Sequence, residues 1–74
     1  MRVDAREILF IRQNAPHGML RVIADNIGMA YSKVRTEFHT LKDEYPDDLV
    51  KEARRLLLAN KGIEYNPETE QLTA

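Results

Sequence analysis

The chain has 74 residues, contains no cysteine and carries a formal net charge of −1 at pH 7. A chain of this length buries only about 60% of the surface of its unfolded state, which excludes a second core and indicates one domain. Without cysteine there is neither a disulfide framework nor a thiolate zinc site, so helix packing must supply the stability.

Apolar residues never accumulate into a membrane segment. The longest apolar runs, residues 8–11 and 56–59, have four residues each, whereas a helix needs roughly 20 to span a bilayer. No apolar stretch of the signal-peptide kind follows the first residues. We therefore expect a soluble, cytoplasmic protein with no membrane partner.

Charge is unevenly distributed along the chain. Residues 1–39 hold six Arg or Lys against four Asp or Glu, whereas residues 40–74 hold five against eight. A mildly basic front and an acidic back are compatible with DNA binding on one face, with modest affinity for a single copy.

A first helix is predicted to begin at Ala5. Asp4 and Glu7 have the spacing of a capping box, in which Asp4 accepts from the amide of Glu7 and the Glu7 side chain reaches back. Pro16 and Gly18 then favour a loop, because the residue before proline avoids the helical conformation and glycine adds freedom.

A second, short helix is predicted over residues 19–27. Ile23, Ala24 and Ile27 form its apolar stripe. Gly28 follows at the position where a helix ends in the left-handed conformation, so we expect a tight turn there.

A third helix is predicted over residues 30–44. Val34, Phe38 and Leu41 recur at the spacing of one helical face. We expect this helix to pack through these three side chains, with Glu37 beside them.

These two helices and their turn resemble the DNA-binding helix-turn-helix of phage Cro proteins and lac-type repressors. As in that motif, the small Ala24 lies in the first helix, Gly28 opens the turn and the β-branched Val34 follows six residues later. Two residues depart from it: Ala30 replaces the usual Ser or Thr cap, and Glu37 occupies a slot that is commonly apolar. The resemblance covers about a quarter of the chain and implies that the second helix of the pair enters the major groove.

The outward face of that helix carries side chains suited to DNA. Arg35 can pair with guanine through two hydrogen bonds, Ser32 and Thr36 can bond base edges or phosphates, and Tyr31 can pack on a thymine methyl. The resemblance places Tyr31, Ser32 and Thr36 where lac-type repressors contact bases. Without the motif, the same face would be the solvated side of an amphipathic helix. The DNA-binding candidates, with Arg21 and Lys33 as phosphate contacts, are Arg21, Tyr31, Ser32, Lys33, Arg35, Thr36 and His39.

No pattern indicates a metal, a cofactor, a small-molecule ligand or catalysis. His39 and Asp43 are four residues apart on the predicted helix, but no third ligand accompanies them. Asp47 and Asp48 are explained by the positive end of the following helix. There is no cysteine nucleophile and no glycine-rich phosphate loop, so we expect a protein that is not an enzyme.

A fourth helix is predicted after Pro46, to about Asn60. Leu56, Leu57 and Leu58 span about 200° of its circumference, which is wider than one small core needs. Two interpretations stay open: Leu58 lies on a partly exposed shoulder, or the three leucines form a homodimer seam.

The chain ends in a tail, residues 63–74, after a helix-turn-helix domain over residues 1–62. Residues 63–65 and 71–73 flank a turn-forming segment and could be the strands of a short hairpin. An isolated hairpin is marginal in water, so the tail docks on the helices, pairs with a second copy or is disordered.

The overall prediction is an all-α, four-helix domain containing a helix-turn-helix, with a short C-terminal extension. We expect a sequence-specific transcriptional regulator that binds double-stranded DNA as a homodimer, through the fourth helix or the tail, because a palindromic site doubles the contacts of one recognition helix. The alternatives are a helical protein–protein interaction module that uses the leucine face, and a DNA-binding component of a larger phage or recombination assembly.

Overall fold

The architecture is known from a computed structural model, which describes residues 1–66. Its helices are α1 (Ala5–Asn14), α2 (Met19–Ile27), α3 (Tyr31–Phe38) and α4 (Asp47–Lys61). Within residues 1–66 there is no strand longer than an isolated antiparallel bridge, between Arg2 and Glu44. The predicted all-α, four-helix fold is confirmed.

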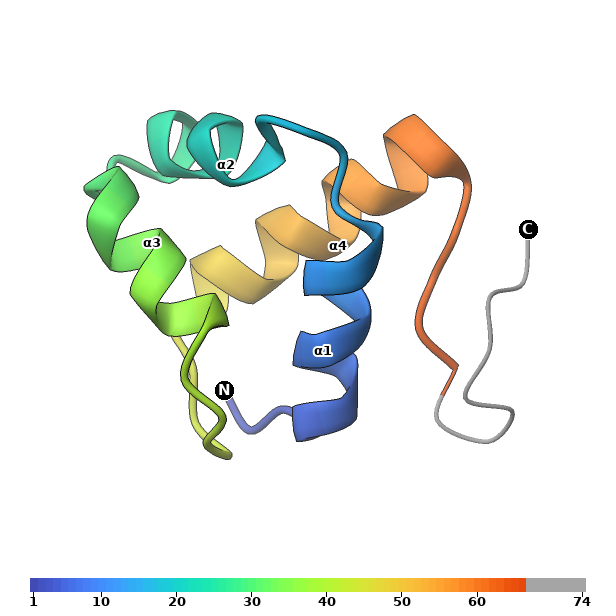
Figure 1. Ribbon diagram of the computed structural model, residues 1–74, viewed down its shortest axis with the longest axis horizontal. Coiled ribbons are helices and arrows are strands. Elements are labelled where there is room, and N and C mark those ends of the chain that lie inside the picture. The colour runs from blue at the N-terminus through green and yellow to red at the C-terminus, as the bar shows by residue number, and fades with distance from the viewer. Residues whose placement is uncertain (67–74) are drawn as a thin grey trace.

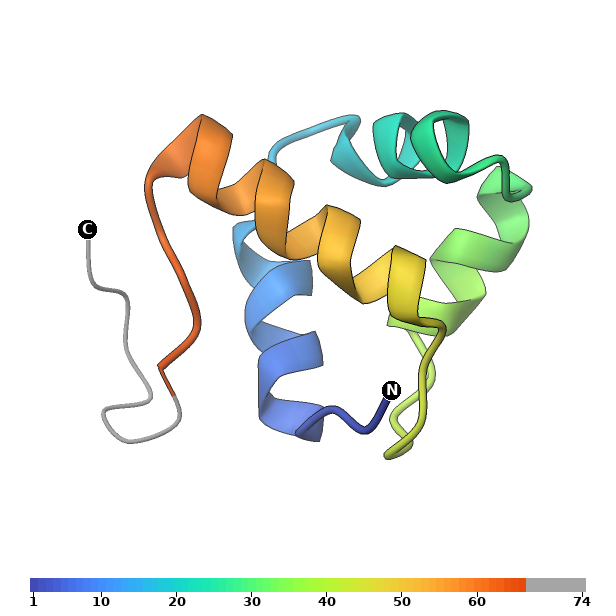
Figure 2. The ribbon, with the colours of Figure 1, turned by 180° about the vertical axis from the view of Figure 1, so that it is seen from behind.

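The longest helix, α4, is the element on which two other helices pack. It spans the width of the molecule, and α1, α2 and α3 lie on one side of it (Figures 1 and 2). The helices α1 and α2 pack directly on α4, and α3 packs on α1 and α2. Side chains from all four helices meet in one core, whose members without any exposed surface include Ile8, Ile23, Phe38 and Leu49. Within the described part of the chain, no helix is long and apolar enough to cross a bilayer.

The start of α1 at Ala5 is confirmed, but its capping differs from the prediction. The Asp4 carboxylate accepts from the amide of Arg6 at 2.8 Å, not from that of Glu7. Glu7 does not reach back: its carboxylate is turned inward, where it accepts two hydrogen bonds from the Arg54 side chain of α4. A charged pair that joins two helices has replaced the local capping box.

The glycine turn between α2 and α3 is present as predicted. Gly28 has φ 70° and ψ 33°, the left-handed conformation, and its amide donates to the carbonyl of Ala24. Residues 28–30 form the whole connection, and α3 crosses the end of α2 at a steep angle (Figure 1). Ala30 supplies no side-chain cap to α3.

Replacing Gly28 with alanine should destabilise the fold by about 1 to 2 kcal/mol, since an L-residue is strained in the left-handed conformation. A Cβ at this position would meet no atom within 4 Å, so the backbone alone carries the cost. For a domain of this size each kcal/mol lowers Tm by about 4–8 °C. Thermal unfolding of the variant measures it, and Gly28→Asn is the matched control because asparagine tolerates this conformation better.

The third helix is shorter than predicted and ends at Phe38, not at residue 44. The amide of His39 is shared between the carbonyls of Arg35 and Thr36, which tightens and closes the last turn. The Tyr45 hydroxyl then holds the connection in an irregular shape, accepting from the Lys42 amide at 2.9 Å. It also donates to the carbonyl of residue 40 at 2.7 Å.

The early end of α3 changes which side chains it buries. Val34 and Phe38 are fully buried, as predicted, whereas Leu41 lies beyond the helix and is 53% exposed. Glu37 is buried on α3, and its carboxylate lies 2.7 Å from the Lys42 Nζ. The helix therefore packs through two apolar side chains and one charged pair, and the prediction that Leu41 packs inward is wrong.

The three leucines of α4 do not form one exposed apolar surface. Leu56 and Leu57 are 8% and 2% exposed and belong to the core, whereas Leu58 is 50% exposed. The wide apolar arc is used within one chain because both α1 and α2 contact α4. Leu58 is therefore partly exposed, as both interpretations require, whereas Leu56 and Leu57 are buried in the monomer.

The chain after α4 turns at Gly62 and returns along α1. Ile63 is buried, and the Tyr65 ring packs against Phe10 edge-on, with 5.4 Å between ring centroids and 62° between planes. The second predicted strand of the hairpin, residues 71–73, lies outside the described residues.

A polar contact fastens α2 to α4 and makes stability depend on pH. Glu52 accepts from the Arg55 Nε at 2.9 Å and from the Asn26 Nδ2 at 2.7 Å. These bonds, Arg55 first, lower the pKa of Glu52 from 4.5 to about 2. Because the folded pKa is the lower one, the stabilisation is present above the ordinary carboxyl pKa and is lost as pH falls toward 2.

We therefore expect Glu52→Gln to melt below the wild-type protein at pH 7, and the difference to shrink between about pH 5 and pH 2. Thermal unfolding of both proteins across this range measures it. A difference in Tm that stays constant down to pH 2 would contradict the bonding of Glu52.

Candidate nucleic-acid interface

The face formed by α1, α2 and α3 carries most of the side chains that the sequence predicts for DNA contact. All seven candidates are exposed. Because α3 is helical from Tyr31, residues four apart on it fall on one stripe. That stripe lines a hollow along the outer side of α3, formed by Tyr31, Ser32, Arg35, Thr36 and His39.

Arg21 joins this stripe from α2. Its guanidinium lies 4.2 Å from the centroid of the Tyr31 ring. Such a cation–π contact uses the face of the guanidinium and leaves its N–H edges free to donate. Tyr31 thus keeps a cation of α2 beside the first turn of α3.

The hydroxyl groups of Ser32 and Thr36 on α3 differ in their hydrogen bonding. The Thr36 hydroxyl donates to the carbonyl of Ser32 at 2.9 Å, within its own helix, which leaves its oxygen able to accept. The Ser32 hydroxyl has no hydrogen-bond partner within residues 1–66. Both polar groups can therefore meet a ligand without breaking a contact to another helix.

Lys33 stands apart from the other candidates. Its Nζ lies 3.8 Å from the Glu37 carboxylate, which also pairs with Lys42. Lys33 does not line the hollow along α3. Lys33, which was predicted to contact a phosphate, therefore lies off the stripe, and the Glu37 carboxylate offsets its charge.

The arginines of this face form no ion pair with an acidic side chain of the described residues. Six of the eleven Lys and Arg side chains form ion pairs with carboxylates. Within the described part of the chain, Arg12, Arg21 and Arg35 form none, nor do Lys51 and Lys61 of α4. Arg12, Arg21 and Arg35 therefore each keep a guanidinium that is not engaged in an ion pair within residues 1–66.

A second hollow adjoins the first and extends the face onto α1. Its lining comes from α1, from the start of α2 and from the end of α3, with His39 shared by both hollows. We call these two neighbouring hollows together the trough. Its residues are Leu9, Arg12, Gln13, Ala15, Leu20, Tyr31, Ser32, Arg35, Thr36 and His39.

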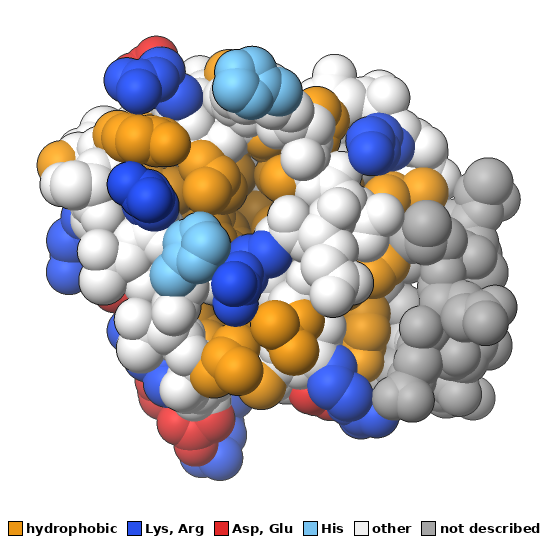
Figure 3. Space-filling model, in the orientation of Figure 1, with side chains coloured by type: hydrophobic (Ala, Val, Ile, Leu, Met, Phe, Trp, Pro, Cys, Tyr) orange, Lys and Arg blue, Asp and Glu red, His pale blue; other side chains and the backbone are white. Residues whose placement is uncertain are grey.

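Among residues 1–66, no carboxylate lines the trough. In Figure 3 the middle of this face shows an apolar hollow ringed by basic and histidine side chains, and the acidic side chains lie toward its rim. The sequence analysis missed Arg12 and Gln13. Their only signal was the excess of basic residues in the first half of the chain, because the position of α1 beside α3 is a tertiary feature.

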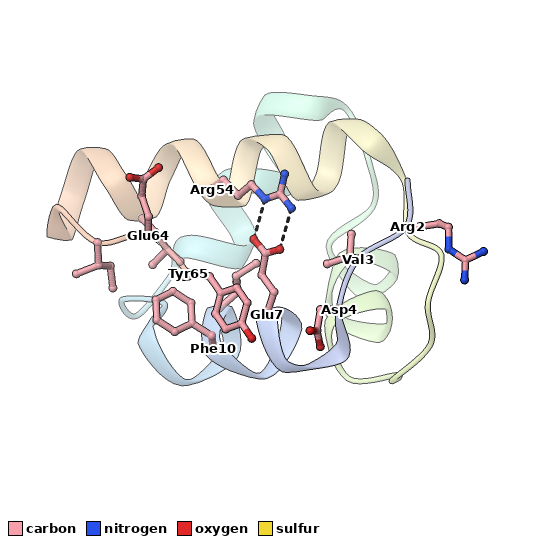
Figure 4. Close-up of a pocket in the computed structure, with 11 residues that line it drawn as sticks. Arg2, Val3, Asp4, Glu7, Phe10, Arg54, Glu64 and Tyr65 are labelled. Atoms are coloured by element: carbon pink, nitrogen blue, oxygen red, sulfur yellow. Dashed lines mark hydrogen bonds and ion pairs between the residues drawn. The ribbon is translucent and has the colours of Figure 1, made fainter. Parts of the chain in front are cut away.

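A separate hollow of about 440 Å³ lies between α1, α4 and the returning chain (Figure 4). At its wall the Arg54 side chain donates from Nε to the Glu7 Oε2 at 2.7 Å and from Nη2 to the Glu7 Oε1 at 2.8 Å. These hydrogen bonds raise the pKa of Arg54. The rings of Phe10 and Tyr65 close one end of the hollow (Figure 4). Because Glu7 and Arg54 bond each other, this pair joins α1 to α4 at the wall of the hollow.

The titratable residues give no sign of a metal centre. Within residues 1–66 no group of three or more His, Asp or Glu side chains lies close enough together to hold a metal ion. His39 instead belongs to the trough.

Comparison with known proteins adds no relative, since no family model, curated protein or solved structure matches the chain.

Proposed function

We propose that the protein is a sequence-specific DNA-binding regulator of transcription and has no catalytic role. The observation that carries the proposal lies on the face that bears α3: within the described residues, Arg12, Arg21 and Arg35 form no ion pair and no carboxylate lines the trough. Phosphates supply the anions that such a face attracts, and they dominate the affinity of proteins for DNA.

In this proposal α3 lies in the major groove with its first turns toward the bases. Arg35 pairs with guanine, and Ser32 and Tyr31 meet neighbouring base edges or methyl groups. Arg21 holds a phosphate beside the groove. The proposal is supported by the exposure of these side chains on one stripe and by the short glycine turn that sets α3 across α2.

We further propose that two copies bind together. One short recognition helix contacts few base pairs. Two copies on a palindromic site double these contacts and so increase the discrimination between DNA sequences. Leu56 and Leu57 are buried and cannot join the copies. Leu58 remains exposed on α4 as one apolar contact for such an interface.

The test is selection of bound duplexes from a random-sequence pool, followed by titration of the selected duplex and of a mixed-sequence duplex over a range of salt. We expect an enriched half-site, repeated about 10 base pairs apart, and a steep loss of affinity as salt rises. The absence of binding to any duplex at low salt would exclude the proposal.

The alternative of a protein–protein interaction module depended on the leucine face of α4. That face is now reduced to Leu58, because its two neighbours lie in the core. The formal net charge of −1 favours this alternative, whereas the arginines of the α3 face that form no ion pair favour DNA, and we retain the DNA-binding proposal.

A further inference from the structure

We propose that the DNA-contacting surface extends beyond α2 and α3 onto α1. The α1 part of the trough, lined by Leu9, Arg12, Gln13, Ala15, Leu20 and His39, seats one sugar–phosphate strand while the α3 part faces the bases, with Arg12 and Gln13 as phosphate contacts. This inference rests on the proposed function and adds a second element to it. It starts from the two neighbouring hollows, which share His39 and run from α3 across to the last turns of α1.

The first argument is the state of Arg12. Its side chain is half-buried on α1, yet no carboxylate within residues 1–66 pairs with it. The aliphatic part of an arginine can lie along apolar surface while its guanidinium stays accessible, and Leu9 and Ala15 line the same hollow. Arg12 is thus a partly immobilised cation without a counter-charge.

The charged groups around the trough share one sign. Among the described residues that line it, the charged or titratable groups are Arg12, Arg35 and His39, and none is acidic. Cations gathered around one depression repel each other, so an anion placed between them is stabilised by all of them. A chain of phosphates matches this arrangement, because its charge is repeated at short intervals.

The third argument is shape and spacing. A helix about 10–12 Å across fills a major groove about 12 Å wide, so the strand that borders the groove lies beside the helix. Packed helices lie about 8–10 Å apart, and α1 packs directly on α3. With α3 in the groove, the side of α1 that carries Arg12 and Gln13 lies over that bordering strand. The hollow beside Arg12 and Gln13 would receive the convex ridge of this strand.

The experiment measures binding of Arg12→Ala to a short mixed-sequence duplex over a range of salt concentrations. We expect about three- to tenfold weaker binding at low salt and a plot of log affinity against log salt whose slope is shallower by about one. The loss should be the same on a selected duplex, because a phosphate contact carries no sequence information.

Lys51→Ala is the matched control. Lys51 is an exposed cation on α4, outside the trough and without an ion pair within residues 1–66, so its removal makes the same change in net charge. We expect this variant to keep the wild-type slope. An equal loss in both variants would show a general charge effect and overturn the seating of a strand in the trough.

A second variant guards against a change in folding. Gln13 is exposed, so Gln13→Glu should fold normally while placing a carboxylate at the edge of the trough. We expect its affinity for mixed-sequence DNA to fall about three- to tenfold, as for a charge repelled by one phosphate. Wild-type affinity and slope in both Arg12→Ala and Gln13→Glu would overturn the inference while leaving the proposed function intact. A wild-type protein that binds no DNA would instead remove the proposed function itself.

Discussion

Arg35→Ala should bind the selected duplex about 1 to 3 kcal/mol more weakly than the wild-type protein and accept other bases at one position of each half-site. Arg35 lies in the middle of the α3 stripe, is exposed and has no acidic partner within residues 1–66. Its guanidinium is therefore free to make the paired hydrogen bonds to guanine O6 and N7 that distinguish this base from the others. Titration of duplexes substituted at each position measures both effects.

The comparison that isolates base recognition is Arg35→Ala against Arg12→Ala. Both remove one unpaired arginine from the trough, so they lower the local charge equally. Only Arg35→Ala is expected to change the ranking of duplexes, whereas Arg12→Ala should weaken all of them alike. An unchanged ranking in Arg35→Ala would remove Arg35 from the recognition of bases and leave it as a phosphate contact.

The parts of the fold that follow from short-range rules were predictable. Helix α2 begins at Met19 and ends at Ile27 as expected, because an apolar stripe and a left-handed glycine set its limits within a few residues. The start of α1 follows for the same reason, with Asp4 as its cap. Such signals need no knowledge of the rest of the molecule.

The end of α3 could not be predicted from its own residues. Leu41 continues the apolar spacing of Val34 and Phe38, and no proline or glycine stops the helix before Tyr45. The hydroxyl of Tyr45 nevertheless bonds the backbone on both sides of Leu41. That contact depends on how the connection folds back on α3, which periodicity does not record.

The candidate interface divides in the same way. The stripe of α3 was predictable because residues on one helix keep a fixed relation to one another. The place of Arg12 beside this stripe was not predictable, because it depends on how α1 packs beside α3. The pairing of Lys33 with Glu37, away from the stripe, was not predictable either, because it depends on the burial of Glu37. The local sequence pattern thus identifies the outward side chains of α3, whereas tertiary packing determines which charged residues of other elements lie beside them.

Phe38→Ala should be the most destabilising single substitution that we propose, at about 3–5 kcal/mol. Phe38 has no exposed surface and is among the largest fully buried side chains of the core. Because it is the last residue of α3, its loss leaves a cavity where this helix meets the others. A domain of 74 residues has a total stability of about 4–11 kcal/mol, so the variant should be close to unfolding, and urea denaturation measures the change.

Leu41→Ala is the decisive control for Phe38→Ala, because the sequence pattern places both side chains on one stripe while the structure separates them. Leu41 lies after the end of α3 and is 53% exposed, whereas Phe38 is fully buried. We expect Leu41→Ala to change stability by no more than about 0.5 kcal/mol, as for most surface substitutions. Equal losses in the two variants would mean that α3 continues through Leu41 and packs there, and would shift the outward stripe of side chains on which the proposed reading of DNA depends.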